Sequence, residues 1–186
     1  MPEKKKNRKK WIVAILLLLL IVLASTYFSA YRGMKEEISA AKEAFMTGTD
    51  GSGYSIYTDL QARVKYARNL HTLALRYLDA EDIRVRDLDA AANRLDGETS
   101  PHKAYEADAA LTEAADKVSL ALESAPLSGT DRSARLGIMQ DLETYAESIS
   151  RRDYNDLARE INEKFSRFPA SFFRIITFTE EAEYFQ

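Results

Sequence analysis

The chain has 186 residues, a formal net charge of −3 and no cysteine, and this length is typical of one domain with an appendage. The charge is uneven, because the first 33 residues hold seven bases and one acid, which leaves 19 bases and 28 acids in the remainder. That acidic remainder disfavours nucleic acid as a partner, and the lack of cysteine excludes disulfides, thiolate nucleophiles and cysteine-bound metals.

A basic cluster in residues 1–10 precedes 21 residues without charge, 11–31. At about 1.5 Å per residue, that run matches the ~30 Å hydrocarbon core of a bilayer. Trp11 at one end and Tyr27 and Tyr31 at the other suit the two membrane interfaces. Because basic residues favour the cytoplasmic side, the pattern predicts a cytoplasmic tail (1–10), a transmembrane helix (11–31) and an extracytoplasmic domain (32–186).

A cleaved signal peptide is the alternative interpretation of the same segment, since a basic region, an apolar region and a candidate Val22-Leu23-Ala24 site are all present. We favour a retained single-pass anchor in the cell membrane, because the apolar run is long and helical sequence continues beyond it. The basic cluster is interpreted as an orientation signal and not as a dedicated lipid-binding site.

The helix is expected to continue to Met46, because residues 34, 38, 41 and 45 are apolar and share one face. It should end in the loop "TGTDGSG", whose glycines favour turns. A calcium loop starting at Asp50 would need an acidic residue at its twelfth position, where Gln61 stands. A simple turn is therefore the prediction.

Apolar residues at helical spacing predict a second helix over about 55–78. Helical texture continues over 81–95, either as a separate helix or beyond a kink. Ser100 is a candidate N-cap for a third helix, with Pro101 in its first turn, and that helix should stop before Pro126.

The last helix is predicted over about 131–167. Its apolar spacing contains one five-residue step, from Ile149 to Tyr154, which we interpret as a slip in register within a continuous helix. No segment shows sustained alternation of period two. The fold class predicted is all-α: an N-terminal transmembrane helix followed by an antiparallel bundle of about four long helices with coiled-coil-like packing, ending in an aromatic tail.

Motifs of known catalysts and metal sites are missing from the sequence, including HExxH, GxSxG and phosphate loops. The two histidines fall in different predicted elements. His71 lies on an apolar stripe, where a core or boundary histidine is commoner than a ligand. We therefore expect no enzyme activity, no cofactor, no metal and no catalytic residue.

The stretch "RRDYNDLAREINEKFSRFP" places Tyr154-Asn155 and Ile161-Asn162 one heptad apart and stops at Phe168-Pro169. The residues expected to point inward in a heptad seam are Tyr154, Ala158, Ile161, Phe165 and Phe168. The asparagines should lie at the edge of that seam and hydrogen-bond a neighbouring helix, which would fix its register. Proline explains the stop, since it disfavours a helical residue before it and cannot donate a hydrogen bond.

This stretch resembles the carboxy-terminal signature of the LemA family, R-x-x-Y-N-x-x-V-x-x-Y-N-x(5)-F-P. Six residues match with every gap preserved: Arg151, Tyr154, Asn155, Asn162, Phe168 and Pro169. Ala158 replaces the aliphatic residue and Ile161 the second tyrosine. The ending Tyr184-Phe185 also resembles the family's, whereas its long second-helix signature survives only as "DLQ" from Asp59 and "NL" from Asn69. The resemblance implies a single-pass membrane protein that carries a helical bundle, of no agreed biochemical activity.

Two functions are compatible with this pattern. The leading hypothesis is an extracytoplasmic scaffold, held at a fixed height above the bilayer, that binds another protein of the cell envelope; whether the chain also binds copies of itself is left open. Its contact surfaces would be the acidic faces and the aromatic tail, although that tail is expected to fold back over the bundle. The alternative is a small-ligand sensor or transport accessory with a cavity between helices, near Arg151, Tyr154, Asn155, Asn162 and His71.

Overall fold

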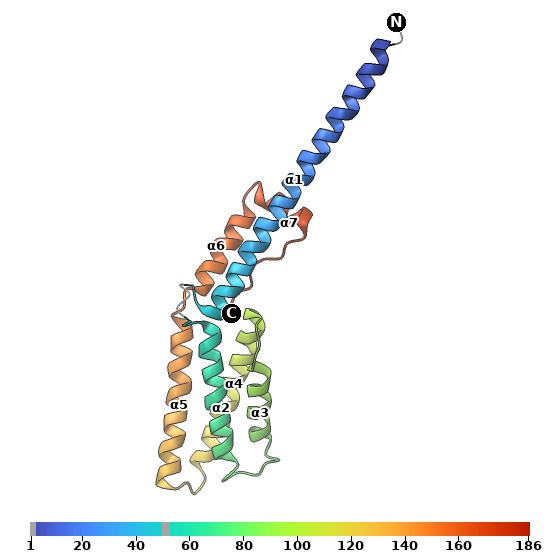
Figure 1. The fold of residues 1–186 in the computed structure, drawn as a ribbon. Helices are drawn as coiled ribbons and strands as arrows, with labels where there is room; N and C mark the ends of the chain where they lie inside the picture. Colours follow the sequence, from blue (N-terminus) through green and yellow to red (C-terminus); the bar gives the residue numbers. More distant parts are fainter. Residues whose placement is uncertain (1–2, 50–52) are drawn as a thin grey trace. The chain divides into compact units, whose positions relative to one another are not determined.

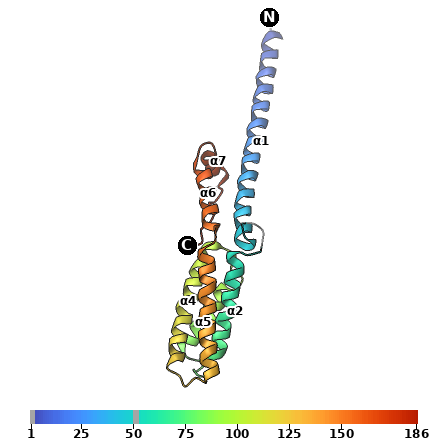
Figure 2. The same ribbon diagram turned by 90° about the vertical axis from the view of Figure 1, so that its left-hand side faces the viewer.

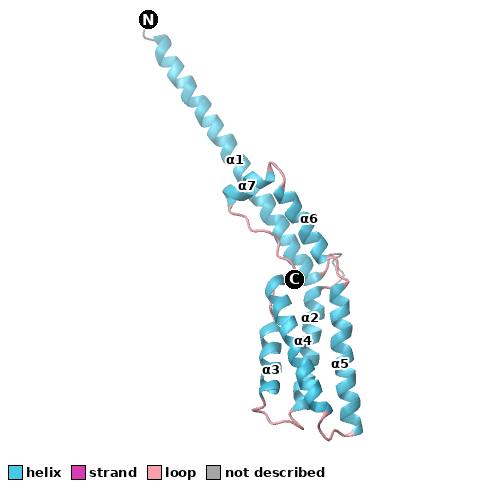
Figure 3. Cartoon of the chain, turned by 180° about the vertical axis from the view of Figure 1, so that it is seen from behind, coloured by secondary structure: helices cyan, strands magenta, loops and turns pink. Residues whose placement is uncertain are grey.

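The computed structural model of the chain describes residues 3–49 and 53–186, so the turn predicted at Asp50 lies outside the described residues. The described residues form seven helices and no strand, which confirms the all-α fold class (Figure 1, Figure 3). The helices are α1 (Glu3–Thr47), α2 (Ile56–Ala74), α3 (Ile83–Leu95), α4 (Pro101–Glu123), α5 (Gly129–Ser150), α6 (Tyr154–Ser166) and α7 (Ala170–Thr177).

The chain divides into two compact units. Unit 1 contains residues 1–40 and 160–181, and unit 2 contains residues 41–159 and 182–186. Helices α1 and α6 each contribute residues to both units. The five residues 182–186 are assigned to unit 2 although the preceding residues are assigned to unit 1.

Helix α1 continues through the uncharged run and on to Thr47, as the sequence predicts. Of the helices in the described residues, it alone is long and apolar enough to cross a membrane, and none of its most apolar 18-residue window is buried by the rest of the chain. Trp11 is exposed, as are the leucines that follow it. Soluble proteins rarely expose an apolar surface of this extent to water, and such a surface marks a site of contact with a membrane or another protein.

In unit 1, the end of α6 and the short helix α7 pack near the α1 residues that follow the apolar run. Lys164 of α6 forms an ion pair with Glu37, and the Thr177 hydroxyl lies 3.9 Å from the sulfur of Met34. Met34 and Phe165 are buried. These contacts bring residues more than 120 positions apart in sequence to the same part of α1.

Unit 2 contains an antiparallel four-helix bundle formed by α2, α3, α4 and α5, in which consecutive helices run in opposite directions (Figure 1, Figure 2). Helix α2 packs against α3 and α5, and α3 packs against α4, whereas α4 and α5 make far fewer contacts. Leucines of the helical stripes are fully buried: Leu60, Leu70, Leu88, Leu95, Leu111 and Leu122. Buried alanines at contact positions let the helix backbones approach closely.

Each bundle helix begins at a side chain that accepts a backbone N–H of the first turn: Ser55, Asp82, Ser100 and Ser128. Such caps satisfy donors that the helix cannot pair internally. Asp82 resolves the open question about residues 81–95, because it starts α3 as a separate helix after turns that follow α2. Ser100 and Pro101 stand where the sequence predicts them.

The predicted continuous helix 131–167 is wrong in one respect. The chain leaves the helical conformation between Ser150 and Tyr154, so the five-residue step is a break between α5 and α6 instead of a slip in register. Leu142 and Ile149 are buried before the break, and Tyr154 and Ala158 after it. A break lets both apolar faces be buried where a continuous helix would aim them about 140° apart, since five steps of 100° give 500°.

Asp131 in the first turn of α5 supports a prediction about pH. Its carboxylate accepts hydrogen bonds from the hydroxyls of Tyr77 (2.5 Å) and Ser128 (3.0 Å) and pairs with Arg76 (2.9 Å). The Tyr77 hydrogen bond is the largest cause that lowers the pKa of this carboxyl from 3.8, and Ser128 and Arg76 add to it. Because the folded pKa is depressed, the stabilisation is present above the unfolded pKa and is lost as the pH falls through the folded value.

We therefore expect Asp131→Asn to be less stable than the wild type between pH 5 and 7 and to match it once the pH is below the folded pKa. Urea unfolding at a series of pH values measures this difference. Asp116→Asn is the control, because Asp116 is exposed on α4. A deficit of Asp131→Asn that stays constant down to the lowest pH would contradict the assignment.

Candidate functional site

The Tyr154-Asn155 pair of the signature lies in unit 2, where it contacts the segment Ala182–Gln186. We call this segment the C-terminal segment and its binding site the segment cleft. The cleft is lined by the end of α1, the start of α4 and the start of α6, through Phe45, Tyr105, Tyr154 and Asn155. The bound segment has no helix or strand of its own.

The side-chain amide of Asn155 forms two hydrogen bonds with the main chain of the segment, one as donor and one as acceptor. Its Nδ2 donates to the carbonyl oxygen of Phe185 at 3.0 Å, and its Oδ1 accepts from the backbone N–H of Phe185 at 2.9 Å. Only an amide side chain offers a donor and an acceptor at this spacing. The interaction therefore fixes both main-chain groups of one residue, Phe185, as a paired residue on a neighbouring antiparallel strand would.

Tyr154 adds a third main-chain contact. Its buried hydroxyl donates to the carbonyl oxygen of Glu183 at 2.7 Å. Burial, followed by the negative charge of Glu183, raises the pKa of this phenol well above its ordinary value. The hydroxyl therefore remains a hydrogen-bond donor at any physiological pH.

The aromatic ring of Phe185 fills the apolar part of the cleft. Its centroid lies 6.2 Å from that of Phe45 and 5.4 Å from that of Tyr105, the latter edge to face. Phe45 also meets Tyr154 at 5.5 Å. Only 9 % of Phe185 is exposed. Aromatic clusters of this geometry add attraction beyond the area that they bury.

The start of α4 holds the two ends of the segment. The Ser100 hydroxyl donates to the Glu183 carboxylate at 2.6 Å, and His102 Nδ1 lies 2.8 Å from the carbonyl oxygen of Gln186. Ser100 thus combines two roles, since it is also the N-cap of α4. The segment cleft thus contacts the main chain, one aromatic side chain and one carboxylate of the C-terminal segment.

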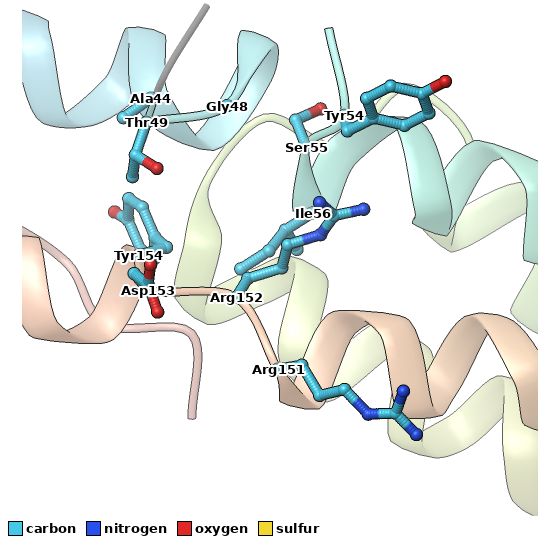
Figure 4. Close-up of a pocket in the computed structure, with 10 residues that line it drawn as sticks. All are labelled: Ala44, Gly48, Thr49, Tyr54, Ser55, Ile56, Arg151, Arg152, Asp153 and Tyr154. Atoms are coloured by element: carbon cyan, nitrogen blue, oxygen red, sulfur yellow. The ribbon is translucent and has the colours of Figure 1, made fainter. Parts of the chain in front are cut away.

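A separate cleft, which shares Tyr154 with the segment cleft, lies between the end of α1, the start of α2 and the break that precedes α6 (Figure 4). It has a volume of about 170 Å³, below the roughly 300 Å³ at which small-molecule pockets begin. Figure 4 shows Arg152 extending toward Ser55 and Ile56, whereas Arg151 points away from Tyr154.

The two arginines differ in their partners. Arg152 pairs with the buried carboxylate of Asp59 at 2.7 Å, and the Ser148 hydroxyl donates to the same carboxylate at 2.9 Å. Arg151, the residue of the family motif, pairs with Glu147 on an exposed face of α5. The motif position is therefore occupied by the more exposed arginine of the pair.

The remaining motif residues lie outside the segment cleft. Asn162, Phe168 and Pro169 belong to unit 1, as the end of α6 and the residues that precede α7. The expectation that Phe168 points inward is wrong, since it is 84 % exposed just beyond the end of α6. Of the predicted membrane-anchor residues, Trp11, Tyr27 and Tyr31 are all exposed on α1.

The interpretation of Asn155 also needs correction. The sequence predicts that it binds a neighbouring helix, but its partner is the irregular C-terminal segment. The expected folding back of the aromatic tail holds for Ala182 and Phe185, which are buried, and not for Phe172, Ile175 and Phe178, which are exposed. His71, which the sequence places on an apolar stripe, is half-buried on α2.

Sequence reasoning missed two buried ion pairs. Arg63 of α2 is 2 % exposed and donates to Asp108 at 2.6 Å and Thr112 at 2.6 Å on α4, and to the Leu142 carbonyl of α5. Asp59, one turn earlier, holds Arg152. Their positions in the sequence could have indicated this burial. Asp59 directly precedes Leu60, and Arg63 directly precedes Val64, on the buried side of α2.

Comparison with known proteins supports the resemblance seen in the signature stretch. The sequence profile of the LemA family matches residues 54–186, which include all four bundle helices, both motif repeats and the C-terminal segment. A search of curated proteins gave no match. A family match over more than two thirds of the chain, with the signature residues in their expected order, establishes that the chain belongs to the LemA family.

Proposed function

We propose that this LemA-family chain is a single-pass membrane protein with a cytoplasmic N-terminus and an extracytoplasmic helical domain that binds another protein of the cell envelope. The membrane part is supported by the 21 uncharged residues of α1 and by the exposure of its most apolar 18-residue window, none of which is buried by the described part of the chain. Helix α1 runs without interruption past Val22-Leu23-Ala24 to Thr47. A retained anchor accounts for this continuity better than a cleaved signal peptide does.

Orientation is tested by adding protease to intact spheroplasts that carry the full chain with a tag before Met1. We expect the family domain to be digested from outside while the tag and residues 1–10 are protected. The intact mass of the membrane-extracted protein gives the second readout. A released domain that lacks the first 24 residues would contradict the anchor, and digestion of the tag from outside would contradict the orientation.

The single observation that best supports protein binding is that the segment cleft holds an irregular stretch of polypeptide, which here is the chain's own residues 182–186. Its contacts engage main-chain groups of a polypeptide through Asn155 and Tyr154, and an aromatic side chain through Phe45 and Tyr105. Unit 2 also carries 22 acidic and 15 basic residues in the printed sequence. This excess of acids favours a partner with a basic surface, because complementary potentials steer association.

In-cell crosslinking of the full chain, with mass-spectrometric identification of its neighbours, tests the interaction. The matched control keeps residues 1–53 and lacks the family domain, so that both proteins share the same anchor. We expect a specific envelope protein to be recovered with the full chain and lost with the control. Equal recovery of the same neighbours by both proteins would contradict a binding role of the family domain.

A second candidate function, a small-ligand sensor, is favoured by a cavity between α4 and α5. The cavity has a volume of about 340 Å³ and lies where these two helices make few contacts. Leu111, Ala115 and Leu142 supply apolar walls, while Asp116 and Glu143 supply carboxylates. Arg63 also lines the cavity but is paired with Asp108, so Asp116 and Glu143 favour a ligand with an apolar body and a cationic group.

The matched variant for this second function is Ala115→Leu, which should fill part of the cavity. A panel of alkylamines is added to both proteins, and the melting temperature is measured. An increase in the wild type that is absent in Ala115→Leu supports a ligand site. The same increase in both proteins would mean that the amines bind elsewhere.

A further inference from the structure

Helix α7 and the residues on either side of it expose a row of large apolar side chains. Phe168, Phe172, Ile175 and Phe178 are spaced by four, three and three residues, and their exposed fractions are 84, 53, 69 and 90 %. We call these four residues the α7 apolar face. Thr177 is instead buried, at 7 % exposure, and half-buried Phe173 and Ile176 separate it from the exposed positions. Helix α7 is therefore amphipathic with its apolar residues on the uncovered side.

The contacts of unit 1 fix where this face lies along α1. The Thr177 hydroxyl meets the sulfur of Met34 at 3.9 Å, and Met34 is three residues beyond the end of the uncharged run at Tyr31. Three residues of helix advance by about 4.5 Å. The polar layer on each side of a bilayer is roughly 5–7.5 Å thick, half of the difference between a total of about 40–45 Å and a core of about 30 Å. Helix α7 thus lies at the height of the lipid headgroups.

From this placement we infer that the α7 apolar face inserts into the outer headgroup layer of the membrane that α1 spans. The inference rests on the proposed transmembrane anchor. Large aromatic side chains are enriched at this depth, and an amphipathic helix in the interface buries its apolar face at the boundary between headgroups and acyl chains. Tyr27, Phe28 and Tyr31 of α1, all exposed, belong to the same layer.

The charged residues around the face are compatible with this position. Arg174 pairs with Glu181 and Arg167 with Glu163, so that the basic side chains next to the apolar face each have an acidic partner at the rim. Helix α7 contacts α1 at Met34, three residues beyond the uncharged run, and this nearness to the proposed membrane span favours lipid over a second protein as the covering of the α7 apolar face. The chain would then contact the membrane twice, through α1 and through α7.

The experiment uses the full chain in vesicles of phosphatidylcholine and phosphatidylglycerol. Because the chain has no cysteine, a single cysteine introduced by Ile175→Cys can carry an environment-sensitive fluorophore. Leu20→Cys reports on the anchor, and Gln140→Cys, on an exposed position of α5, serves as the aqueous control. Lipids with a quencher near the headgroup or near the chain end locate the depth of each label.

We expect the label at position 175 to show a blue-shifted emission and to be quenched more strongly by the quencher near the headgroup than by the one near the chain end. The label at position 20 should respond to the quencher near the chain end. The label at position 140 should respond to neither. A label at 175 that remains in water while that at 20 is deep would overturn the inference and leave the anchor intact. A label at 20 that remains in water would contradict the proposed anchor itself.

A protein partner or a second copy on the α7 apolar face would give a different result. The label at 175 would then be blue-shifted but unaffected by quencher lipids, which would also overturn the inference. The variant Phe172→Ser/Ile175→Ser, labelled through Phe178→Cys, provides a further check. It should lose most of the lipid quenching seen with Phe178→Cys alone, while the α-helical circular dichroism of the protein is unchanged.

Discussion

Replacing Asp108 by alanine should lower the free energy of unfolding of unit 2 by about 3–5 kcal/mol, because it leaves the Arg63 guanidinium buried without its counter-charge. The Arg63 side chain is almost fully buried, and 15 % of the Asp108 side chain is exposed. Burial raises the pKa of the Asp108 carboxyl, and the Arg63 charge opposes that rise. The Arg63 charge therefore helps to keep the Asp108 carboxylate ionised in the bundle.

The comparison variant is Asp96→Ala, which removes an Arg–Asp pair of similar length on the surface. Arg68 and Asp96 are 2.7 Å apart but 49 and 41 % exposed, and exposed pairs contribute only about 0–1 kcal/mol. The double variant Arg63→Met/Asp108→Leu should recover most of the loss, since no unpaired charge remains. Urea unfolding followed by circular dichroism measures all three variants. Equal effects of Asp108→Ala and Asp96→Ala would contradict the role given to the buried pair.

Replacing Phe185 by alanine should lower the free energy of unfolding of unit 2 by about 3–5 kcal/mol, the range for removal of a buried phenylalanine ring. The ring is the apolar anchor of the C-terminal segment, and its loss also removes the contacts with Phe45 and Tyr105. With the ring gone, only the polar contacts of Asn155, Tyr154, Ser100 and His102 remain to hold five irregular residues. We expect the segment to detach while α2–α5 stay folded.

Phe178→Ala is the matched control for Phe185→Ala, because the same side chain is removed from a residue that is 90 % exposed. Its effect on the stability of unit 2 should be within about 0.5 kcal/mol, as for other surface positions. Both variants are measured by urea unfolding in the same detergent. If the two phenylalanines prove equally important, Phe185 is not the anchor of the segment.

The helices were predictable from the sequence because local chemistry determines them. The apolar run of α1, the Ser100-Pro101 start of α4 and the stripes of α2 and α5 depend on residues within one or two turns of each other. The LemA signature was recognisable for the same reason, since its residues lie within 19 positions. Periodicity and capping are local signals, and they were sufficient for the fold class.

The candidate site was not predictable in the same way, because its contacts are distant in sequence. Asn155 binds Phe185 thirty residues later, and Ser100 binds Glu183 eighty-three residues later. A heptad pattern cannot distinguish an asparagine that faces a helix from one that faces an irregular segment. The break between α5 and α6 was missed because spacing alone does not distinguish a register slip from a helix end, and because the pairing of Arg152 with Asp59 spans ninety-three residues.

Amide hydrogen exchange at Phe185 tests most directly the claim that the Tyr-Asn pair holds the C-terminal segment in its cleft. The N–H of Phe185 donates to Asn155 Oδ1, so its exchange should be slow in the wild type and should approach the rate of an unstructured peptide in Asn155→Ala. The amide of Leu111, inside α4, should be unaffected by that substitution. Exchange of the Phe185 amide at the unstructured rate in the wild type, or at the same slow rate in Asn155→Ala, would contradict the account.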